Sequence, residues 1–304
     1  MHVVVAGGTG FIGTALVRRL VRDGRRVTVL TRRSEAEARK LLPRSVSVVR
    51  WQSGVPAAPL PAEADAVVNL AGAAIARRWT QAAKRLIVDS RVQTTRAVVR
   101  ALKERQSASG APRVLVNASA VGYYGPRGDE RVTERDGPGD DFLSHVCRQW
   151  EGAAVEAEDA GVRVVRLRTG FVVGRGGALP LMMLPFRLLV GGPLGSGRQW
   201  MPWVHLDDVV GLILFALEHE GVSGPLNVSA PEPVRNREFA RVLGRVMRRP
   251  SWAPAPAPVM RAVLGEMADM ILTGQRAVPE AALGAGYEFR HPDLEAALRD
   301  ILER

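Results

Sequence analysis

The sequence predicts an α/β fold in which a doubly wound parallel sheet carries a smaller carboxyl-terminal α/β lobe. Apolar, β-branched runs alternate with amphipathic segments over roughly the first 170 residues, which is typical of a parallel sheet covered by helices on both faces. A glycine-rich turn follows the first of these runs. The length of 304 residues suits one large domain with an appended lobe.

The elements of the predicted sheet can be placed in chain order. A strand buried on both faces appears as a short apolar run, and a helix as apolar residues three and four positions apart. The expected strands are 2–6, 26–31, 46–50, 66–70, 113–119 and 162–168. The expected helices between them are 11–23, 35–42, 80–105 and 141–160.

The pattern changes after residue 174. Gly- and Pro-rich loops at 174–181 and 190–202 are followed by a Pro-Ala linker at 250–258, and such loops commonly cover a crevice. Helices are expected at 206–220, 237–248, 259–272 and 292–302. We therefore predict a first domain over 1–175, with 206–220 packed on it, and a smaller substrate-binding lobe over 176–304.

Composition limits the classes of partner and compartment. The net charge of +11 and the sequence pI near 11.0 raise the question of nucleic acid or an anionic membrane, but the basic residues are nearly all arginines scattered along the chain. This favours a compositional bias, so we expect neither nucleic acid nor a membrane as partner. The only cysteine, Cys147, forms no intrachain disulfide, which favours the cytoplasm. No run reaches the ~20 apolar residues of a membrane span.

The glycine turn predicts a dinucleotide site of Rossmann type. It follows a strand and opens a helix, the context in which glycines permit a sharp turn and a close approach to a pyrophosphate. The helix amino terminus then offers its amides to the phosphates. The expected cofactor contacts in this turn are Gly7, Thr9, Gly10, Phe11, Ile12 and Gly13.

The end of the second strand predicts which dinucleotide binds. An acid there would accept hydrogen bonds from a free ribose 2′-hydroxyl, whereas this chain has Thr31, Arg32 and Arg33. Paired guanidinium groups suit a 2′-phosphate, so NADP(H) is favoured over NAD(H). In a parallel sheet the later strand ends line the same crevice, which adds Leu70, Ala71, Gly72, Ser119 and Val172, the last placed against the nicotinamide.

Four of these segments together resemble the extended short-chain dehydrogenase/reductase superfamily, in its NAD-dependent epimerase/dehydratase family. They are 7–13, 69–72, 119–125 (SAVGYYG) and 204–209 (VHLDDV). Further segments are similar to its YfcH-like subfamily, also labelled the SulA family of sugar-nucleotide-epimerase-like proteins, which ends in a DUF1731 domain; here that domain would begin near 250. These are 91–95, 168–170, 184–187, 191–197, 200–208 and 273–276. The resemblance also implies that Arg91 contacts the cofactor.

The resemblance implies a catalytic Ser with a Tyr-x-x-x-Lys pair, in which the Tyr acts as general acid and base. The pair is absent, because no lysine follows Lys103, and Leu143 and Cys147 fall at its two positions. Ser119 remains, and Tyr123 or Tyr124 is a candidate replacement. His145 is a weaker candidate, and Cys147 is expected to be buried packing.

The loop at 191–205 is the candidate substrate site, with Gln199, Trp200 and Trp203 as expected contacts for a planar or sugar-like ligand; a Trp pair that only anchors the second lobe is the alternative. Three functions follow. The first is an NADP(H)-dependent oxidoreductase or epimerase-like enzyme for a small polar, nucleotide-sugar-like substrate. The second is a non-catalytic NADP(H)-binding sensor, and the third, least favoured, is a nucleic-acid-binding protein. The resemblance is compatible with a homodimer, and no metal site is expected.

Overall fold

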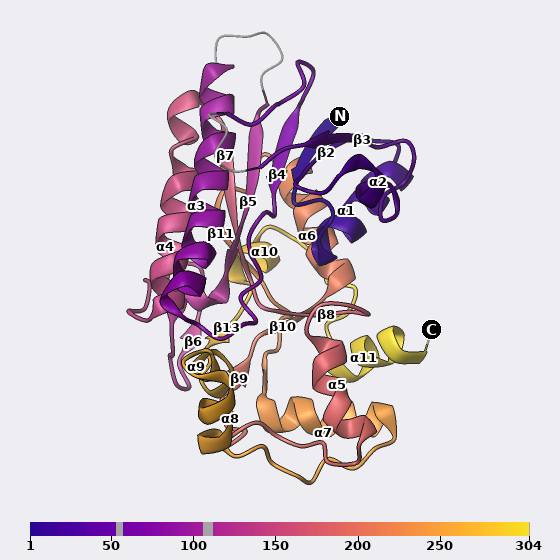
Figure 1. Cartoon of the computed structure of the whole chain (residues 1–304), viewed down its shortest axis with the longest axis vertical. Helices are drawn as coiled ribbons and strands as arrows, with labels where there is room; N and C mark the ends of the chain where they lie inside the picture. The colour runs from indigo at the N-terminus through magenta and orange to yellow at the C-terminus, as the bar shows by residue number, and fades with distance from the viewer. Residues whose placement is uncertain (53–56, 106–111, 304) are drawn as a thin grey trace.

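The computed structural model describes residues 1–52, 57–105 and 112–303 (Figure 1). Its centre is a sheet of seven parallel strands in the order β11-β7-β5-β4-β1-β2-β3, so the chain starts in the middle and winds outward in both directions. The predicted α/β fold is confirmed. The strands are β1 (His2–Ala6), β2 (Arg26–Thr31), β3 (Ser47–Arg50), β4 (Ala66–Asn69), β5 (Val114–Ala120), β7 (Arg163–Thr169) and β11 (Gly224–Val228).

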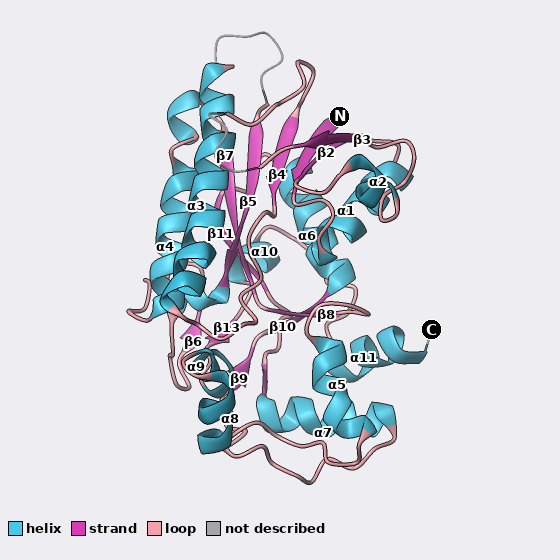
Figure 2. Cartoon of the chain, viewed as in Figure 1, coloured by secondary structure: helices cyan, strands magenta, loops and turns pink. Residues whose placement is uncertain are grey.

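Side chains alternate between two cores because successive residues of a strand face opposite sides of the sheet. In β1, Val3 and Val5 pack on one side, whereas Val4 and Ala6 pack on the other. Helices α1 (Phe11–Arg22) and α6 (Leu206–Glu218) cover the first side. Helix α3 (Gln81–Glu104) covers the second, with α4 (Phe142–Val155) packed beside it (Figure 2).

The second lobe lies beyond the carboxyl ends of the strands (Figure 1). Its core joins α5 (Leu179–Arg187), α7 (Asn236–Met247) and α11 (Leu294–Glu303) around Phe186, Trp203 and Phe239. Two short strand pairs join the first domain to the second lobe: β8 (Phe171–Val173) with β10 (Trp203–His205), and β6 (Arg131–Val132) with β13 (Arg276–Ala277). A third pair, β9 (Trp200–Met201) with β12 (Val234–Arg235), lies within the second lobe. The remaining elements are α2 (Glu35–Arg39), η1 (Val121–Tyr124), η2 (Glu158–Ala160), α8 (Ala257–Leu264), α9 (Met267–Leu272) and α10 (Glu280–Gly284).

Three of the differences from the sequence-based expectation concern α5, the α8–α9 segment and β11. Helix α5 begins where a loop was predicted, because Pro180 stands in its first turn, where a proline costs no hydrogen bond. The helix predicted over 259–272 is split into α8 and α9 at Gly265, whose φ is +63°. Strand β11 was not predicted, and it adds to the sheet residues from beyond the expected boundary at 175.

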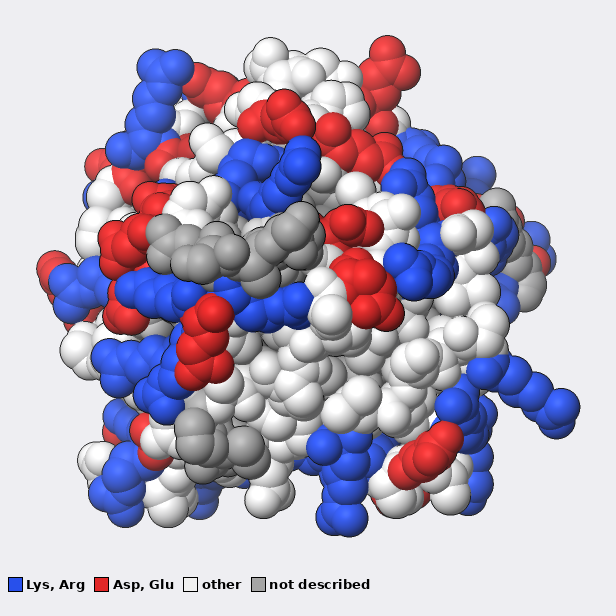
Figure 3. Space-filling model, turned by 90° about the horizontal axis from the view of Figure 1, so that it is seen from above, with Lys and Arg blue, Asp and Glu red and all other residues white. Residues whose placement is uncertain are grey.

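Two surface features bear on the expected partners. Among the described residues, no helix is both long and apolar enough to cross a bilayer. On the face at the amino ends of the strands, basic and acidic side chains are interspersed (Figure 3). Many arginines of the described chain are paired with acids, as Arg25 is with Glu218 at 2.7 Å. This pairing agrees with a compositional bias toward arginine.

Candidate functional site

The glycine turn forms a cradle at the carboxyl end of β1. Gly7 adopts φ +80°, and its carbonyl accepts a hydrogen bond from Gly10 N–H at 3.0 Å. A Cβ at Gly13 would lie 2.3 Å from the Gly7 carbonyl oxygen, so only glycine permits this close approach. Helix α1 has Gly10 as its N-cap, with no capping side chain and no acid in its first turn. Its first amides are therefore left for an anion.

A cleft of about 490 Å³ opens beside this cradle. Nine of the predicted cofactor residues line it: Gly7, Thr9, Gly10, Thr31, Arg32, Arg33, Leu70, Ala71 and Gly72. These nine residues come from the ends of β1, β2 and β4, as expected for a parallel sheet. Phe11, Ile12, Gly13, Arg91, Ser119 and Val172 lie outside this lining. The structure thus brings most of the predicted cofactor site together, at the end that suits an adenosine moiety.

The rim after β2 carries two exposed arginines. Thr31 is buried, and its hydroxyl shares a hydrogen bond of 3.0 Å with the Thr9 hydroxyl, which holds β2 against the cradle. Arg32 and Arg33 follow directly; neither guanidinium has an ion-pair or hydrogen-bond partner among the described residues. Two exposed cations at the edge of a cleft suit a phosphate.

Glu37 is an acid that also lines this cleft. One of its carboxylate oxygens accepts hydrogen bonds from the Ser34 amide at 2.8 Å and the Ser34 hydroxyl at 2.7 Å. These bonds lower the pKa of Glu37 and complete the capping box of α2. Since that oxygen is engaged in capping, only the other carboxylate oxygen of Glu37 is left for a ribose hydroxyl.

Arg91 lies on α3 beside the end of β4. Its Nη1 donates to the carbonyls of Ala73 and Ile87, both at 3.1 Å, and its guanidinium lies 5.0 Å from the Trp150 ring centroid. A Cβ at Gly72 would lie 3.2 Å from the Arg91 guanidinium carbon. Burial lowers the pKa of Arg91. The guanidinium is thus fixed in place next to the cleft.

Ser119, near the end of β5, belongs to a buried polar network. Its hydroxyl donates to Glu151 Oε1 at 2.7 Å. The Glu151 side chain is only 4% exposed and accepts two hydrogen bonds from Arg168, at 2.9 and 3.0 Å. Arg166 approaches the same carboxylate at 3.4 Å. Burial alone would lower the pKa of Arg168, but the hydrogen bonds and charge of Glu151 outweigh burial and raise it.

The two candidate tyrosines differ in accessibility. Tyr124 is fully buried; its hydroxyl donates to Asn227 at 2.7 Å and accepts from Arg168 at 3.0 Å. Burial raises the pKa of Tyr124 to about 12. The expectation that Tyr124 donates a proton to a substrate was wrong, because neither surface nor a free hydroxyl is left. Tyr123 keeps part of its surface, and the Arg168 guanidinium lies 3.5 Å from its ring centroid.

Leu143 and Cys147 stand where the resemblance implies the catalytic Tyr and Lys. Both lie beside the end of β5. A Cβ at Gly122 would lie 3.2 Å from the Leu143 Cβ, so this leucine packs on η1. The Cys147 thiol is buried and donates to the Ala120 carbonyl at 3.7 Å. Burial raises the pKa of Cys147 to about 12, as expected for packing rather than reactivity. His145 is exposed and contacts Gln149 on its own helix.

The predicted substrate contacts are only partly accessible. Trp203 is 0% exposed, lies in the core of the second lobe and donates to the Glu232 carbonyl. Its expected contact with substrate was wrong, because the ring anchors the lobe. Trp200 is partly exposed, but Asp129 accepts from its indole N–H at 2.9 Å and the guanidinium groups of Arg235 and Arg276 lie 4.5 and 4.8 Å from its ring centroid.

Gln199, the third predicted substrate contact, is anchored by backbone groups. Its amide nitrogen donates to the carbonyls of Leu194 and Ile271 at 2.9 and 3.0 Å. Its amide oxygen is buried without a partner among the described residues. A buried acceptor without a donor is costly, and a ligand donor or an ordered water would satisfy it.

The geometry of cradle, rim and strand ends can now be compared with known proteins. The family model described as "NAD dependent epimerase/dehydratase family" matches residues 3–229, and the model "Domain of unknown function (DUF1731)" matches residues 255–301. The chain belongs to the NAD-dependent epimerase/dehydratase family. The predicted family and carboxyl-terminal domain are thereby confirmed.

Three relatives of this family member match essentially all of the chain. The "Epimerase family protein YfhF" of Bacillus subtilis is 40% identical, over 99% of this chain and 98% of the relative. The "Epimerase family protein SDR39U1 homolog, chloroplastic" of Arabidopsis thaliana is 42% identical, over 100% and 87%. The crystal structure of human epimerase family protein SDR39U1 (isoform 2) with NADPH is 39% identical, covers 100% of both chains and superimposes with a TM-score of 0.89.

Several positions that line the cleft or contact Ser119 and its partners were not predicted. Trp51 and Gln52 follow β3 and line the cleft, and the rule that strand ends meet at one edge would have found them. Glu151 and Arg168 were missed as a pair because their contact joins α4 to β7 through tertiary packing. The other unpredicted lining residues are Leu30, Glu37, Ala73, Ser90 and Thr94.

A second polar cluster lies where the two lobes meet. His205 Nε2 is buried and unpartnered among the described residues, 3.6 Å from an oxygen of Asp300, and the His291 ring lies 3.8 Å from the His205 ring. A metal would need the lone pair of His205 Nε2. However, His205 Nδ1 accepts the Asp207 amide at 3.1 Å, so the proton of the neutral ring is on Nε2. This hydrogen bond argues against metal binding there.

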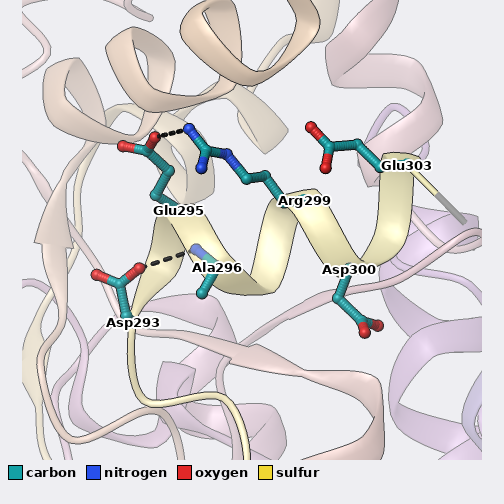
Figure 4. Close-up of a pocket in the computed structure, with 6 residues that line it drawn as sticks. All are labelled: Asp293, Glu295, Ala296, Arg299, Asp300 and Glu303. Atoms are coloured by element: carbon teal, nitrogen blue, oxygen red, sulfur yellow. Dashed lines mark hydrogen bonds and ion pairs between the residues drawn. The ribbon is translucent and has the colours of Figure 1, made fainter.

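A shallow depression along α11 also carries acids. Figure 4 shows its side chains spread along one helix, with Glu295 paired to Arg299 and Asp293 accepting from the Ala296 amide. Two of the acids have partners on the same segment, and the side chains do not converge on a common point. The depression therefore does not compete with the cleft at the glycine turn as the ligand site.

Proposed function

We propose that this protein is an NADP(H)-dependent oxidoreductase or epimerase-like enzyme that acts on a small polar substrate of the nucleotide-sugar kind. The observation that carries the proposal is the pair of exposed, unpaired arginines, Arg32 and Arg33, at the rim of a cleft that also holds the glycine cradle. NADPH in the related human structure supports the same cofactor. A reduced, buried Cys147 agrees with action in the cytoplasm.

The proposed cofactor contacts divide the dinucleotide along the sheet edge. The amides of 10–13 would hold the pyrophosphate, and Arg32 with Arg33 the 2′-phosphate. Leu70, Ala71 and Gly72 would lie against the adenosine half. Arg91 would reach toward the bound cofactor from its anchored position beside Gly72, with Val172 and Ser119 at the nicotinamide end.

When bound, NADP(H) would supply or accept a hydride, so this chain has to handle the proton that accompanies it. The Ser119 hydroxyl directs its own proton to Glu151, which leaves the lone pairs of its oxygen to accept a hydrogen bond from a substrate hydroxyl. Tyr123 is the neighbouring hydroxyl with exposed surface. We therefore place Ser119 and Tyr123 as the groups that orient the substrate hydroxyl and move its proton.

A second candidate function is a non-catalytic NADP(H)-binding sensor. It is favoured by one observation: around the strand end at Ser119, Leu143 and the Cys147 thiol are packing groups and the Tyr124 phenol is fully engaged. In this case cofactor occupancy would change the contact with a partner. The two functions share the cofactor site and differ only in turnover.

The cofactor assignment is tested by titrating the protein with NADPH and NADH and repeating the titration with Arg32→Glu/Arg33→Glu. A charge-assisted hydrogen bond contributes about 1.5–3 kcal/mol, so loss of both arginines should weaken NADPH binding by at least about 100-fold and leave NADH binding little changed. The exposed Arg44→Glu, outside the cleft, is the matched control. Unchanged discrimination between the two cofactors would refute the assignment.

Turnover distinguishes the enzyme from the sensor. NADPH oxidation is followed in a stopped-flow screen against carbonyl compounds and nucleotide sugars, with Ser119→Ala and Tyr123→Phe as test variants. Tyr124→Phe is the control, since its buried phenol is not placed in the reaction. Loss of turnover in a test variant but not in the control supports the enzyme. Tight NADPH binding with no turnover across the panel supports the sensor.

A further inference from the structure

The second lobe exposes an apolar patch formed by Leu188, Leu189, Val190 and Trp252. Their exposed fractions are 65%, 51%, 50% and 68%. Single exposed apolar residues are ordinary, but four large ones in contact are not. The patch lies at the end of the molecule farthest from the amino ends of the strands, where the chain segments after α5 and α7 run along the bottom of the lobe (Figure 1).

The patch is built by contacts between these two segments. The Trp252 indole N–H donates to the Leu189 carbonyl at 3.0 Å, and the Trp252 amide donates to the Gly191 carbonyl at 2.9 Å. Gly191 and Ser251 form a β-bridge. Leu189 has φ +64°, a conformation that a leucine rarely adopts, and these bonds hold its segment in place.

The same surface continues along α5. Leu184 is 52% exposed and Leu181 70% exposed, and they precede Leu188 by one and two helical turns. Residues at this spacing share one face of a helix. The apolar patch therefore extends into an apolar stripe on α5 that no other part of the described chain covers.

Basic charge borders the patch. Arg187, Arg248 and Arg249 are exposed, and none has a carboxylate within 4.0 Å among the described residues. Arg248 and Arg249 follow α7 directly, and the end of α7 lies against α5. A Cβ at Gly244 would lie 2.9 Å from the Arg249 carbonyl oxygen and 3.3 Å from the Phe186 ring of α5. The sequence has no Asp or Glu at 174–206 or at 239–265. By contrast, Arg241 and Arg245, earlier in α7, pair with acids.

The apolar patch and the exposed arginines beside it together indicate which kind of partner fits. A second copy packed through the same surface would bring the three arginines of one molecule against those of the other. A nucleic acid would leave the leucines and valine without apolar contacts. An anionic bilayer surface offers both requirements, since Trp and Leu enter the interface while arginines contact the headgroups.

We propose that the apolar patch and its arginine rim dock the second lobe onto an anionic lipid surface. The contact is peripheral and needs no membrane-spanning helix. It departs from the sequence-based expectation of no membrane partner, because the arginines that lack acidic neighbours are far apart in sequence and gather only in the fold. The proposal does not depend on the cofactor or on turnover.

The test is flotation of the full-length protein with vesicles of phosphatidylcholine alone or mixed with phosphatidylglycerol. The protein should float with the mixed vesicles at low salt, return to solution as salt rises, and stay in solution with phosphatidylcholine alone. Leu189→Ser/Trp252→Ser should abolish flotation. Arg187→Gln/Arg249→Gln should reduce partitioning about 30-fold, since each basic residue near such a surface contributes roughly fivefold.

Matched controls test whether the effect belongs to this patch. Leu86→Ser removes an exposed leucine from α3, and Arg96→Gln/Arg100→Gln removes two exposed arginines from the same helix. Both should float as the unmodified protein does. Circular dichroism and thermal unfolding of every variant verify the fold.

Absence of flotation at low salt, equal flotation with both vesicle types, or equal loss in patch and control variants would overturn the proposal. Self-association that disappears in Leu189→Ser/Trp252→Ser, without vesicle binding, would also overturn it by identifying a second copy as the partner.

Discussion

Replacement of Glu151 by Gln should reveal how much the buried network behind Ser119 contributes to the fold. The substitution keeps the shape of the side chain but leaves the guanidinium of Arg168, only 3% exposed, without a counter-charge. Breaking a buried ion pair by removing one partner costs about 3–5 kcal/mol. At roughly 2 °C for each kcal/mol in a chain of this size, Tm should fall by about 6–10 °C.

Urea denaturation followed by circular dichroism measures this cost. The double variant Glu151→Gln/Arg168→Met should recover part of the lost stability, because it leaves no buried guanidinium without a counter-charge. Asp159→Asn is the control; it removes the partner of Lys103 from an exposed ion pair, which should cost less than about 1 kcal/mol. A cost for Glu151→Gln no larger than that of Asp159→Asn would refute the reasoning.

Three further predictions concern single positions. Gly13→Ala would place Cβ 2.3 Å from the Gly7 carbonyl oxygen, so it should lower Tm and remove NADPH binding; a variant that binds NADPH normally in a fluorescence titration would contradict the cradle. Because burial raises the pKa of Cys147 to about 12, the native thiol should react with DTNB at pH 8 at least about 100-fold more slowly than the urea-unfolded chain, and equal rates would contradict its burial. Burial also raises the pKa of Tyr124 from 10.0 to about 12, so its phenol stays neutral in the folded protein at pH values where it would ionise in the unfolded chain. The stability linked to this shift should be complete below pH 10 and be lost as pH rises toward 12. Tyr124→Phe should flatten that loss in a pH series of urea midpoints.

The parts of the fold that follow local rules were predictable. The strand 2–6, the glycine turn and the helix after it lie within about 20 residues, and each choice of residue agrees with the next. The cofactor rim at Thr31 to Arg33 was predictable because parallel strands end at one edge of the sheet. These residues could be predicted without knowledge of tertiary contacts beyond that rule.

The parts that depend on distant contacts were not predictable. Strand β11 (GPLNV) begins with Gly-Pro, which reads as a turn, and becomes a strand by pairing with β7. The accessibility of Tyr123 and Tyr124, which are adjacent in sequence, is decided by Arg168 and Asn227. Trp200 and Trp203 likewise differ by whether the core of the second lobe closes over the ring. The sequence pattern supplies none of these partners.

The position of β11 at the edge of the sheet has a consequence for synthesis of the chain. Strand β7 ends at Thr169, but the strand that covers its outer edge ends only at Val228, after all of α5, β9, β10 and α6 has been made. At ~5–20 residues per second, the nascent sheet would present an unpaired edge for about 3–12 s. A ribosome that pauses between these two strands would lengthen that interval, and the newly made edge would be open to pairing with a neighbouring nascent chain.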